Sequence, residues 1–382
     1  MFGKNFISYF FCAASLSLAG IIATGCSQES KIQSFKPGQI WPDNNGVHIN
    51  AHGGGMLFHD GKYYWYGEHK TEGEAGNVAN VGVHCYSSTD LYNWKDEGIA
   101  LSVDSAGSGS PIEKGCILER PKVIYNSKTG KFVMWFHLEP KGAGYKGAHS
   151  GVAVSDCVTG PFKFIRAGRI NPGKWAVNYP EELKDKPLAP DEGPYSGGSL
   201  PKHPDSLNLP KRDFEGGQMA RDMNLFVDDD GKAYHIYSSE ENSTLHIAQL
   251  SDDYTTHSGK FIRLFQGRFM EAPAMFKYNG KYYLMMSGCT GWSPNAARSA
   301  VADSIFGEWK ELGNPCVDAD SATTYHSQST YILPLDAKNG KFIYMGDRWT
   351  PKNAIDGRYI WLPLEFDGER FVLRWKDEWS LE

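Results

Sequence analysis

The chain has 382 residues, of which 41% are hydrophobic and 13% aromatic, and its formal net charge is −6. This length suits one large domain or two ordinary ones, and the 42 glycines and 20 prolines favour short strands and many turns over helical bundles. The negative charge argues against nucleic acid as a partner, because binding to phosphates needs clustered positive charge.

The first 26 residues have the features of an export signal. Lys4 precedes a mostly apolar run from Phe6 to Ala23, and small residues then lead to Cys26. The run is short for a membrane span, so the pattern predicts a bacterial lipoprotein in which residues 1–25 are removed and Cys26 is lipidated. An ordinary secretory signal and a membrane anchor are the alternatives. We expect residues 26–40 to be a polar tether. We also expect the protein to be exported to the periplasm or the outer-membrane surface, where only its lipid contacts the membrane.

Five turns of one kind recur along residues 41–382. Each places a glycine followed by a lysine between two apolar segments, which is a strong signal for a β-hairpin. The turn glycines are Gly61, Gly130, Gly231, Gly280 and Gly340. Further strand-like segments follow the hairpins, the last of them near residues 369–375. A four-stranded unit that repeats about every 50–70 residues predicts an all-β fold, a five-bladed β-propeller.

Residues 171–217 break this rhythm. They contain eight prolines between Pro172 and Pro210 and show little apolar periodicity. Because a loop of this length inside a domain is either functional or disordered, we expect an insertion between blades two and three, at the rim of a site.

Polar residues occupy the positions that a propeller brings to its central funnel. Those just before the first strands are His52, Glu119, Asp222, Glu271 and Gln328. Those seven residues past each turn glycine are Glu68, His137, Ser238, Ser287 and Asp347. Strand ends that simply face water are the alternative explanation. An acidic funnel suits a carbohydrate, and Trp65, Trp292 and Trp349 near strand ends are candidates either for stacking on a sugar or for the core.

Several long stretches resemble glycoside hydrolase family 43, and within it the exo-β-1,3-galactanases of subfamily 24. They include "AHGGGMLFHDGKYYWYGEHK", "LERPKVIYN", "RDMNLFVDDDGKAYHIYSSEEN", "GRFMEAPAMFKYNGKYYLMMSGCTGWSPN", "HSQSTYILP" and "GDRWTPKN", in this order. The resemblance implies an inverting mechanism in which Glu271 of "EAP" is the general acid. It also implies that Asp222 of "RDM" raises the pKa of that acid, because two close carboxylates resist being ionised together.

The same stretches supply candidates for contact with the sugar. They are Glu68, His52, Glu241, Asn242, Trp292, Asp347, Arg348 and Trp349. The resemblance also implies the substrate, which is the β-1,3-galactan backbone of an arabinogalactan-type polysaccharide.

The chain departs from the family at the general base, because "INAHGGG" has no carboxylate where most of family 43 has an aspartate. An inverting enzyme needs a base on the far side of the sugar, roughly 6.5–9.5 Å from the acid. The resemblance implies Gln328, acting through its imidic-acid tautomer. Glu119 and Glu68 are the alternatives, since both belong to the same ring.

Two other functions stay open at this point. One is another family 43 activity, such as α-L-arabinofuranosidase; the other is a sugar-binding propeller without catalytic activity. The five cysteines after Cys26 are scattered and odd in number, which argues against a zinc site. We expect no cofactor or metal ligand set, although some propellers of this family hold calcium on their axis. We also expect a monomer, without a separate carbohydrate-binding module.

Overall fold

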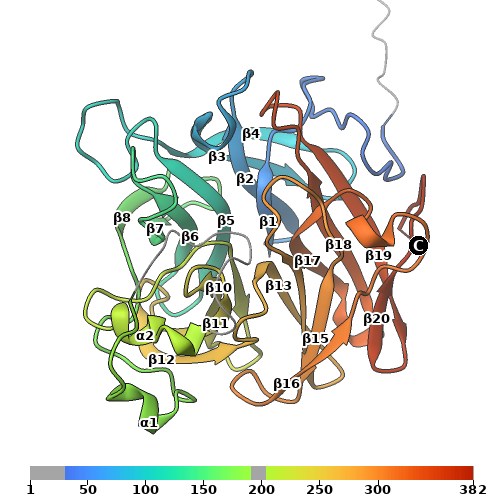
Figure 1. The fold of residues 1–382 in the computed structure, drawn as a ribbon. Coiled ribbons are helices and arrows are strands. Elements are labelled where there is room, and N and C mark those ends of the chain that lie inside the picture. The colour runs from blue at the N-terminus through green and yellow to red at the C-terminus, as the bar shows by residue number, and fades with distance from the viewer. Residues whose placement is uncertain (1–30, 191–203, 382) are drawn as a thin grey trace, which may run out of the picture. The chain divides into compact units, whose positions relative to one another are not determined.

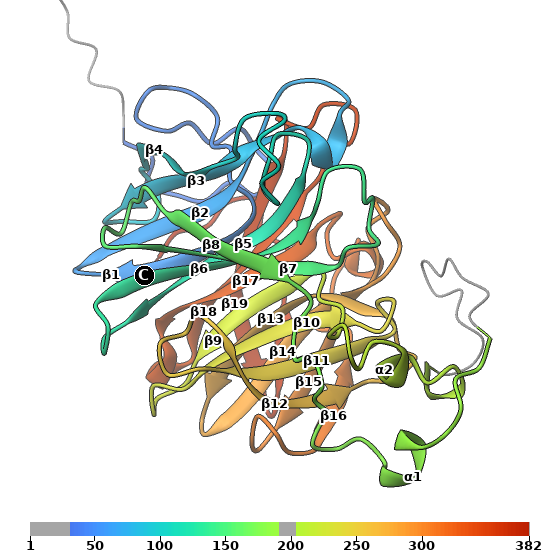
Figure 2. The ribbon, with the colours of Figure 1, turned by 90° about the vertical axis from the view of Figure 1, so that its left-hand side faces the viewer.

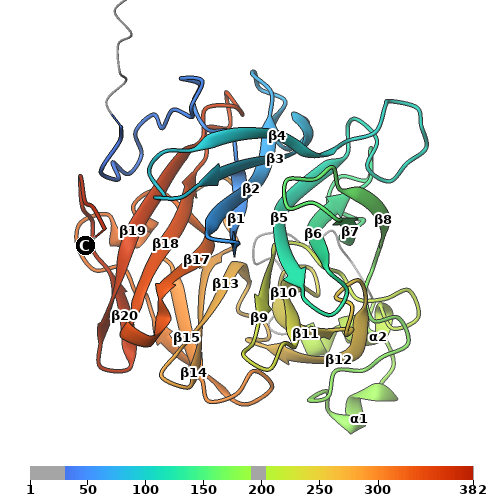
Figure 3. The ribbon, with the colours of Figure 1, turned by 180° about the vertical axis from the view of Figure 1, so that it is seen from behind.

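The computed structural model describes residues 31–190 and 204–381, and residues 33–382 form one unit. This unit contains five antiparallel sheets of four strands each, and every sheet is built from consecutive strands. Figures 1 and 3 show the first strands near the middle and the fourth strands at the periphery. The inner strands contact one another in the closed order β1, β5, β9, β13, β17 and back to β1. The predicted five-bladed β-propeller is confirmed.

Blade one consists of β1 (His52–His59), β2 (Lys62–Lys70), β3 (Asn80–Ser88) and β4 (Lys95–Ser102). Blade two consists of β5 (Ile117–Asn126), β6 (Lys131–Glu139), β7 (His149–Ser155) and β8 (Lys163–Gly168). Blade three consists of β9 (Met223–Val227), β10 (Ala233–Ser239), β11 (Thr244–Leu250) and β12 (His257–Leu264). Blade four consists of β13 (Met270–Tyr278), β14 (Lys281–Gly288), β15 (Arg298–Ala302) and β16 (Trp309–Gly313). Blade five consists of β17 (Gln328–Asp336), β18 (Lys341–Arg348), β19 (Arg358–Asp367) and β20 (Arg370–Leu373).

All five predicted turns join the first and second strands of a blade. In blade four, Asn279 and Gly280 both have positive φ, 48° and 75°, and Tyr278 pairs with Lys281 across the turn. Two successive residues of positive φ form the type of tight turn whose twist matches that of antiparallel strands, and asparagine and glycine tolerate this conformation best. The short sequence signal therefore determines where each hairpin reverses.

The apolar core lies between neighbouring sheets. Tyr66 and Cys85 of blade one, for example, pack in one cluster with Leu118 and Phe136 of blade two. Since each sheet buries both faces, its inner strands read as nearly continuous apolar runs. This packing fixes the orientation of each blade, and with it the position of the strand ends at the axis.

The two ends of the unit meet at the junction of blades five and one. Phe35 and Trp379 exchange two backbone hydrogen bonds of 2.7 and 3.1 Å, and Phe35 is only 2% exposed. Trp65 is buried in the same cluster, together with Trp361, so it belongs to the core and not to a sugar platform. Placing the tether at residues 26–40 was therefore wrong at its C-terminal end, because Phe35 already packs into the propeller.

The insertion lies between β8 and β9, as expected. Its described residues include two short α-helices, α1 (Glu181–Lys184) and α2 (Leu209–Arg212), which Figure 2 shows beside the third blade. Ala176 and Tyr179 of its first half are buried against blades two and three. Residues 191–203 of the insertion, like Cys26 and the rest of residues 1–30, lie outside the described residues.

Four single turns of 3-10 helix complete the secondary structure of the described residues. They are η1 (Gly76–Val78), η2 (Pro204–Ser206), η3 (Ser321–Thr323) and η4 (Ala337–Asn339). Among the described residues, none of the helices has the length and apolar character needed to cross a membrane.

Candidate active site

The ten polar positions predicted from the turns are five pairs of directly opposed residues. Four pairs are cross-strand partners: His52 with Glu68, Glu119 with His137, Glu271 with Ser287, and Gln328 with Asp347. In the fifth, the Ser238 N–H donates to the carbonyl of Asp222 at 3.0 Å. The blades thus bring equivalent residues to one end of the axis.

A cavity of about 510 Å³ opens at this end. It is lined by Glu68, Asn77, Glu119, Arg120, His137, Tyr145, Arg221, Asp222, Glu241, Asn242, Glu271, Cys289, Gly291, Trp292, Gln328 and Trp349. All four predicted catalytic residues are among them. The size and the mixture of carboxylates, amides and tryptophans fit a small polar ligand such as a sugar.

Local backbone geometry explains how the strand starts point at the cavity. The ladder shifts register just after His52, Glu119 and Glu271, and in each case the next residue has positive φ: Gly53 at 57°, Arg120 at 56° and Ala272 at 53°. A β-bulge of this kind turns the first side chain relative to the rest of the strand. The strained conformation costs arginine and alanine of order 1 kcal/mol, which is typical of functional sites.

Glu271 has the properties of a proton donor. Its burial, and secondly the negative charge of Asp222, raise its pKa to about 8. Its Oε1 accepts a hydrogen bond of 3.0 Å from Nε2 of Gln328. A carboxyl group with this pKa keeps its proton near neutral pH, which is the state that a general acid needs.

Arg120 holds together Asp222 and Gln328, two of the predicted catalytic residues. Its guanidinium lies 3.0 Å from Oδ2 of Asp222, donates to Oε1 of Gln328, and donates to the Ser329 carbonyl at 2.7 Å. Because the arginine occupies the amide oxygen of Gln328, the amide nitrogen faces Glu271. The sequence did not point to Arg120, which directly follows Glu119 in "LERP", because the bulge that turns it inward is visible only in the structure.

The two glutamates proposed as alternative bases are both engaged. Burial alone would raise the pKa of Glu119, but hydrogen bonds from His137 at 2.9 Å and Tyr145 at 2.8 Å outweigh it and lower this pKa to about 2. Glu68 accepts from the Arg120 N–H at 2.9 Å and lies 2.8 Å from Nζ of Lys70; burial still raises its pKa. Glu119 is therefore a weak base, and both glutamates have partners on each oxygen.

Glu119, His137 and Asp222 lie close enough together to suggest a metal site. The histidine does not fit one. Its Nδ1 donates to Glu119 and its Nε2 donates to Glu139 at 3.0 Å, and although burial opposes it, these carboxylates raise the pKa of His137 to about 9. A protonated imidazole has no lone pair for a metal ion, so the cluster is better explained as an ion-paired support for Glu119.

The predicted sugar contacts divide into two groups. Glu68, Glu241, Asn242, Trp292 and Trp349 line the cavity, and Trp292 is 45% exposed. Trp292 and Trp349 meet edge to face at 5.7 Å between ring centroids. Glu241 is held by Arg212 at 3.0 Å and Arg221 at 3.3 Å, so the insertion that carries Arg212 reaches the rim of the cavity.

The other three lie outside the cavity lining. His52 is fully buried and stacks on Trp349 at 5.1 Å, so it supports that ring from below. Asp347 is 2% exposed and accepts from the Gly53 N–H, which connects blade five to blade one; burial raises its pKa to about 7. Arg348 donates to the Tyr325 carbonyl at 2.7 Å. None of these three residues lines the cavity in this structure, and contact between them and a sugar stays a prediction.

Comparison with known proteins agrees with this geometry. A family model described as glycosyl hydrolases family 43 matches residues 201–344. A solved GH43 β-1,3-galactosidase, in a structure with galactodeoxynojirimycin, is 55% identical over 91% of this chain and 100% of that chain, with a TM-score of 0.85. The chain belongs to glycoside hydrolase family 43.

Other relatives of this family 43 chain are more distant. The exo-β-1,3-galactanase of Phanerochaete chrysosporium, solved with β-1,3-galactotriose, is 30% identical over 92% of this chain and 68% of that chain, with a TM-score of 0.73. A xylosidase/arabinosidase of Bacteroides ovatus is 27% identical over 70% of this chain and 78% of its own length. The chain spans only 37% of a β-D-galactofuranosidase of Aspergillus niger, with 24% identity over the matched part.

Proposed function

We propose that this family 43 glycoside hydrolase, which is of the β-1,3-galactosidase type, releases galactose from the ends of β-1,3-galactan by inverting hydrolysis. The observation that carries the proposal is the Glu271 carboxyl group, whose pKa is raised to about 8 at a cavity walled by Trp292. The 55%-identical relative is a β-1,3-galactosidase, and a second relative was solved with β-1,3-galactotriose.

In the proposed reaction Glu271 gives its proton to the glycosidic oxygen, and the bond from that oxygen to the anomeric carbon breaks. A water molecule attacks the anomeric carbon from the opposite face, and its proton passes to a base. The product has the inverted anomeric configuration. The Glu271 carboxylate then takes a proton from solvent. The negative charge of Asp222 favours this step, because two close carboxylates repel each other.

We propose Gln328 as the base. Its position in the ring and the family resemblance favour it. Glu119 and Glu68 are carboxylates and would ordinarily be stronger bases than an amide, but their oxygens are already bound by neighbouring side chains and the backbone. Nε2 of Gln328 now lies 3.0 Å from Oε1 of Glu271, whereas an inverting pair needs room for a sugar and a water molecule between acid and base. Binding of the sugar must therefore break this hydrogen bond.

The test is incubation with linear β-1,3-galactan and, separately, with an aryl α-L-arabinofuranoside. We expect release of galactose from the galactan. Proton NMR during the reaction should show that the anomer formed first has the inverted configuration. Glu271→Gln should lower turnover of galactan by roughly 10²–10⁴-fold. Turnover of the arabinofuranoside alone would instead favour the activity class of the Bacteroides relative, and binding without turnover would favour a sugar-binding propeller.

We further propose that the natural substrate is an arabinogalactan-type polysaccharide and that the protein is an exported, lipid-anchored monomer. Support for the anchor comes from the sequence around Cys26 alone. Labelling of cells with a fatty-acid analogue should modify the wild-type protein and leave Cys26→Ser unlabelled, and sedimentation of a soluble form from residue 27 should give the mass of one chain. Equal labelling of both proteins would contradict lipidation at Cys26.

A further inference from the structure

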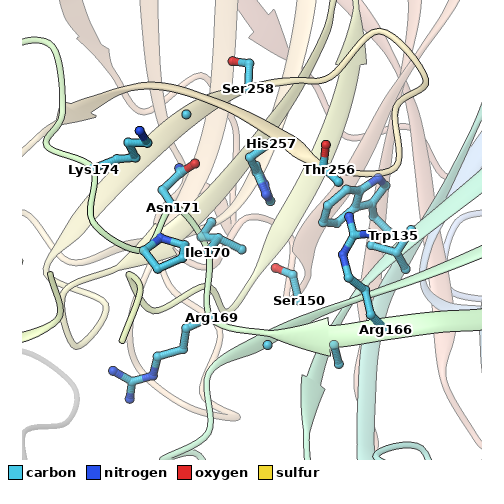
Figure 4. A pocket seen from close by; sticks show the side chains of 15 residues that line it. Trp135, Ser150, Arg166, Arg169, Ile170, Asn171, Lys174, Thr256, His257 and Ser258 are labelled. Carbon is cyan, nitrogen blue, oxygen red and sulfur yellow. The ribbon is translucent and has the colours of Figure 1, made fainter. Parts of the chain in front are cut away.

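A second cavity lies between the outer strands of blades two and three, beneath the start of the insertion (Figure 4). Its volume is about 320 Å³, at the lower end for small-ligand pockets. It is lined by Trp135, Ser150, Val152, residues 166–172, Lys174 and residues 256–259. None of these residues lines the catalytic cavity. The cavity is therefore a separate concave surface.

Buried polar groups without partners face this cavity. Ser150 is 4% exposed and Asn171 is 5% exposed, yet the Ser150 hydroxyl and both polar atoms of the Asn171 amide lack hydrogen-bond partners among the described residues. The hydroxyl of Tyr237 is beside Asn171 but does not meet hydrogen-bond geometry with it. A hydroxyl and an amide each offer donors and acceptors, which is what a polyhydroxylated ligand requires. Leaving such groups buried and unpaired is costly, so the cavity favours an occupant.

The charge of the lining is one-sided. Arg166, Arg169 and Lys174 line the cavity and no acidic residue does. Arg166 and Lys174 are exposed at its edge, whereas Arg169 is committed to Asp213 at 3.0 Å. His257 contributes no charge near neutral pH, because burial and the neighbouring Arg166 lower its pKa to about 3. Two cations beside unpaired hydroxyl and amide groups select for a ligand that is both anionic and rich in hydroxyls.

A chain of ion pairs joins the two cavities. Arg169 of the second cavity binds Asp213, Asp213 also binds Arg212 at 2.9 Å, and Arg212 binds Glu241 of the catalytic cavity at 3.0 Å. Asp213 is 5% exposed, so these contacts are protected from solvent.

We propose that this second cavity is a binding site for a hexuronate, either free or as the terminal unit of a polysaccharide branch. The carboxylate would be bound by Arg166, and the ring hydroxyls by Ser150, Asn171 and Lys174, the last of which Figure 4 shows across the cavity from Arg166. Trp135, whose indole N–H already donates to the Tyr254 carbonyl at 2.8 Å, would offer an apolar wall. Binding of the free monosaccharide does not depend on the catalytic activity proposed above.

The test is a ligand-observed NMR titration of the intact protein with glucuronate and with galacturonate. We expect either or both to bind more tightly than glucose, which lacks the carboxylate, and than acetate, which lacks the hydroxyls. The double variant Arg166→Gln/Lys174→Gln should weaken hexuronate binding by roughly tenfold or more, because both charge-assisted contacts are lost. Asn171→Asp keeps the shape of the side chain and tolerates positive φ, and it should weaken binding by repelling the carboxylate.

Lys163→Gln is the matched control, since Lys163 is an exposed cation on the same strand as Arg166 and does not line the cavity. It and Glu271→Gln should bind hexuronate as the wild type does. Since Arg166 and Lys174 are both exposed, the double variant should fold, which circular dichroism would verify. Absence of hexuronate binding, equal binding by the double variant, or binding no tighter than acetate would each overturn the proposal. A branched substrate carrying a terminal hexuronate then distinguishes a branch site from a site for the free sugar.

Discussion

The pKa of Glu271 depends on Asp222, so Asp222→Asn should move the pH range of activity. The Asp222 carboxylate accepts from the Ala272 N–H at 3.1 Å, next to Glu271 in the chain, and its charge raises the pKa of Glu271. For two unit charges about 6 Å apart, an effective dielectric constant of about 20–40 gives an interaction of roughly 1.4–2.8 kcal/mol, or about one to two pKa units. Removing the charge of Asp222 also leaves Arg120 unneutralised, which lowers the pKa of Glu271 further in the same direction.

The assay is kcat/KM on β-1,3-galactan between pH 5 and 10. Because the protonated acid is the active form, the wild type should lose activity as the pH rises through about 8. In Asp222→Asn this basic limb should move down by about one to two units. Glu241→Gln is the control, since Glu241 also lines the cavity but is paired with Arg212 and Arg221. A basic limb that stays in place, or moves upward, in Asp222→Asn would refute the electrostatic coupling.

Three further outcomes are expected. The pKa of Glu271 is higher in the folded chain than the usual 4.5, so its contribution to the free energy of unfolding falls as the pH rises from about 5 to 8. Glu271→Gln should therefore be more stable than the wild type at pH 9, by roughly 1–4 kcal/mol. Chemical unfolding of both proteins at pH 5 and pH 9 would test this. Gln328→Ala should abolish turnover, and added azide should restore the activity of this variant. If azide instead restores Glu119→Ala, and Gln328→Ala stays active at high substrate concentration, the base is Glu119. Trp292→Ala should raise KM by about fivefold to fiftyfold with a folded protein, because this exposed ring has no core contact to lose; an unchanged KM would exclude stacking on the sugar.

The repeat made the fold and much of the site predictable. Turn glycines determine the strand reversals, and the reversals determine which residues lie at the axis; Glu271, Asp222 and Gln328 were found in this way. The pairing of Glu271 with Ser287 follows from the same counting. These positions are predictable because hairpin geometry is local. The propeller repeats the same hairpin in every blade, whatever side chains the blade carries.

Three features depended on contacts between blades, which the sequence does not display. Arg120 of blade two contacts Asp222 beside blade three and Gln328 of blade five. Only the bulge after Glu119 turns this arginine inward. His52 occupies an equivalent place in blade one but is covered by Trp349. Phe35 looked like part of a polar segment because its partner, Trp379, is distant in sequence.

The meeting of Phe35 and Trp379 has a consequence for how the ring could be cut. In many rings a closing sheet takes strands from both ends of the chain, but here all five described sheets consist of consecutive strands. Side-chain packing, this two-bond bridge and hydrogen bonds such as that from the Gly53 N–H to Asp347 therefore make the closure, and no described sheet is divided by it. A short linker between the two ends would let new termini be opened in the connection between any two blades. Each such circular permutant would keep every hairpin intact, so the order in which the blades are synthesised could be varied while the catalytic ring stays the same.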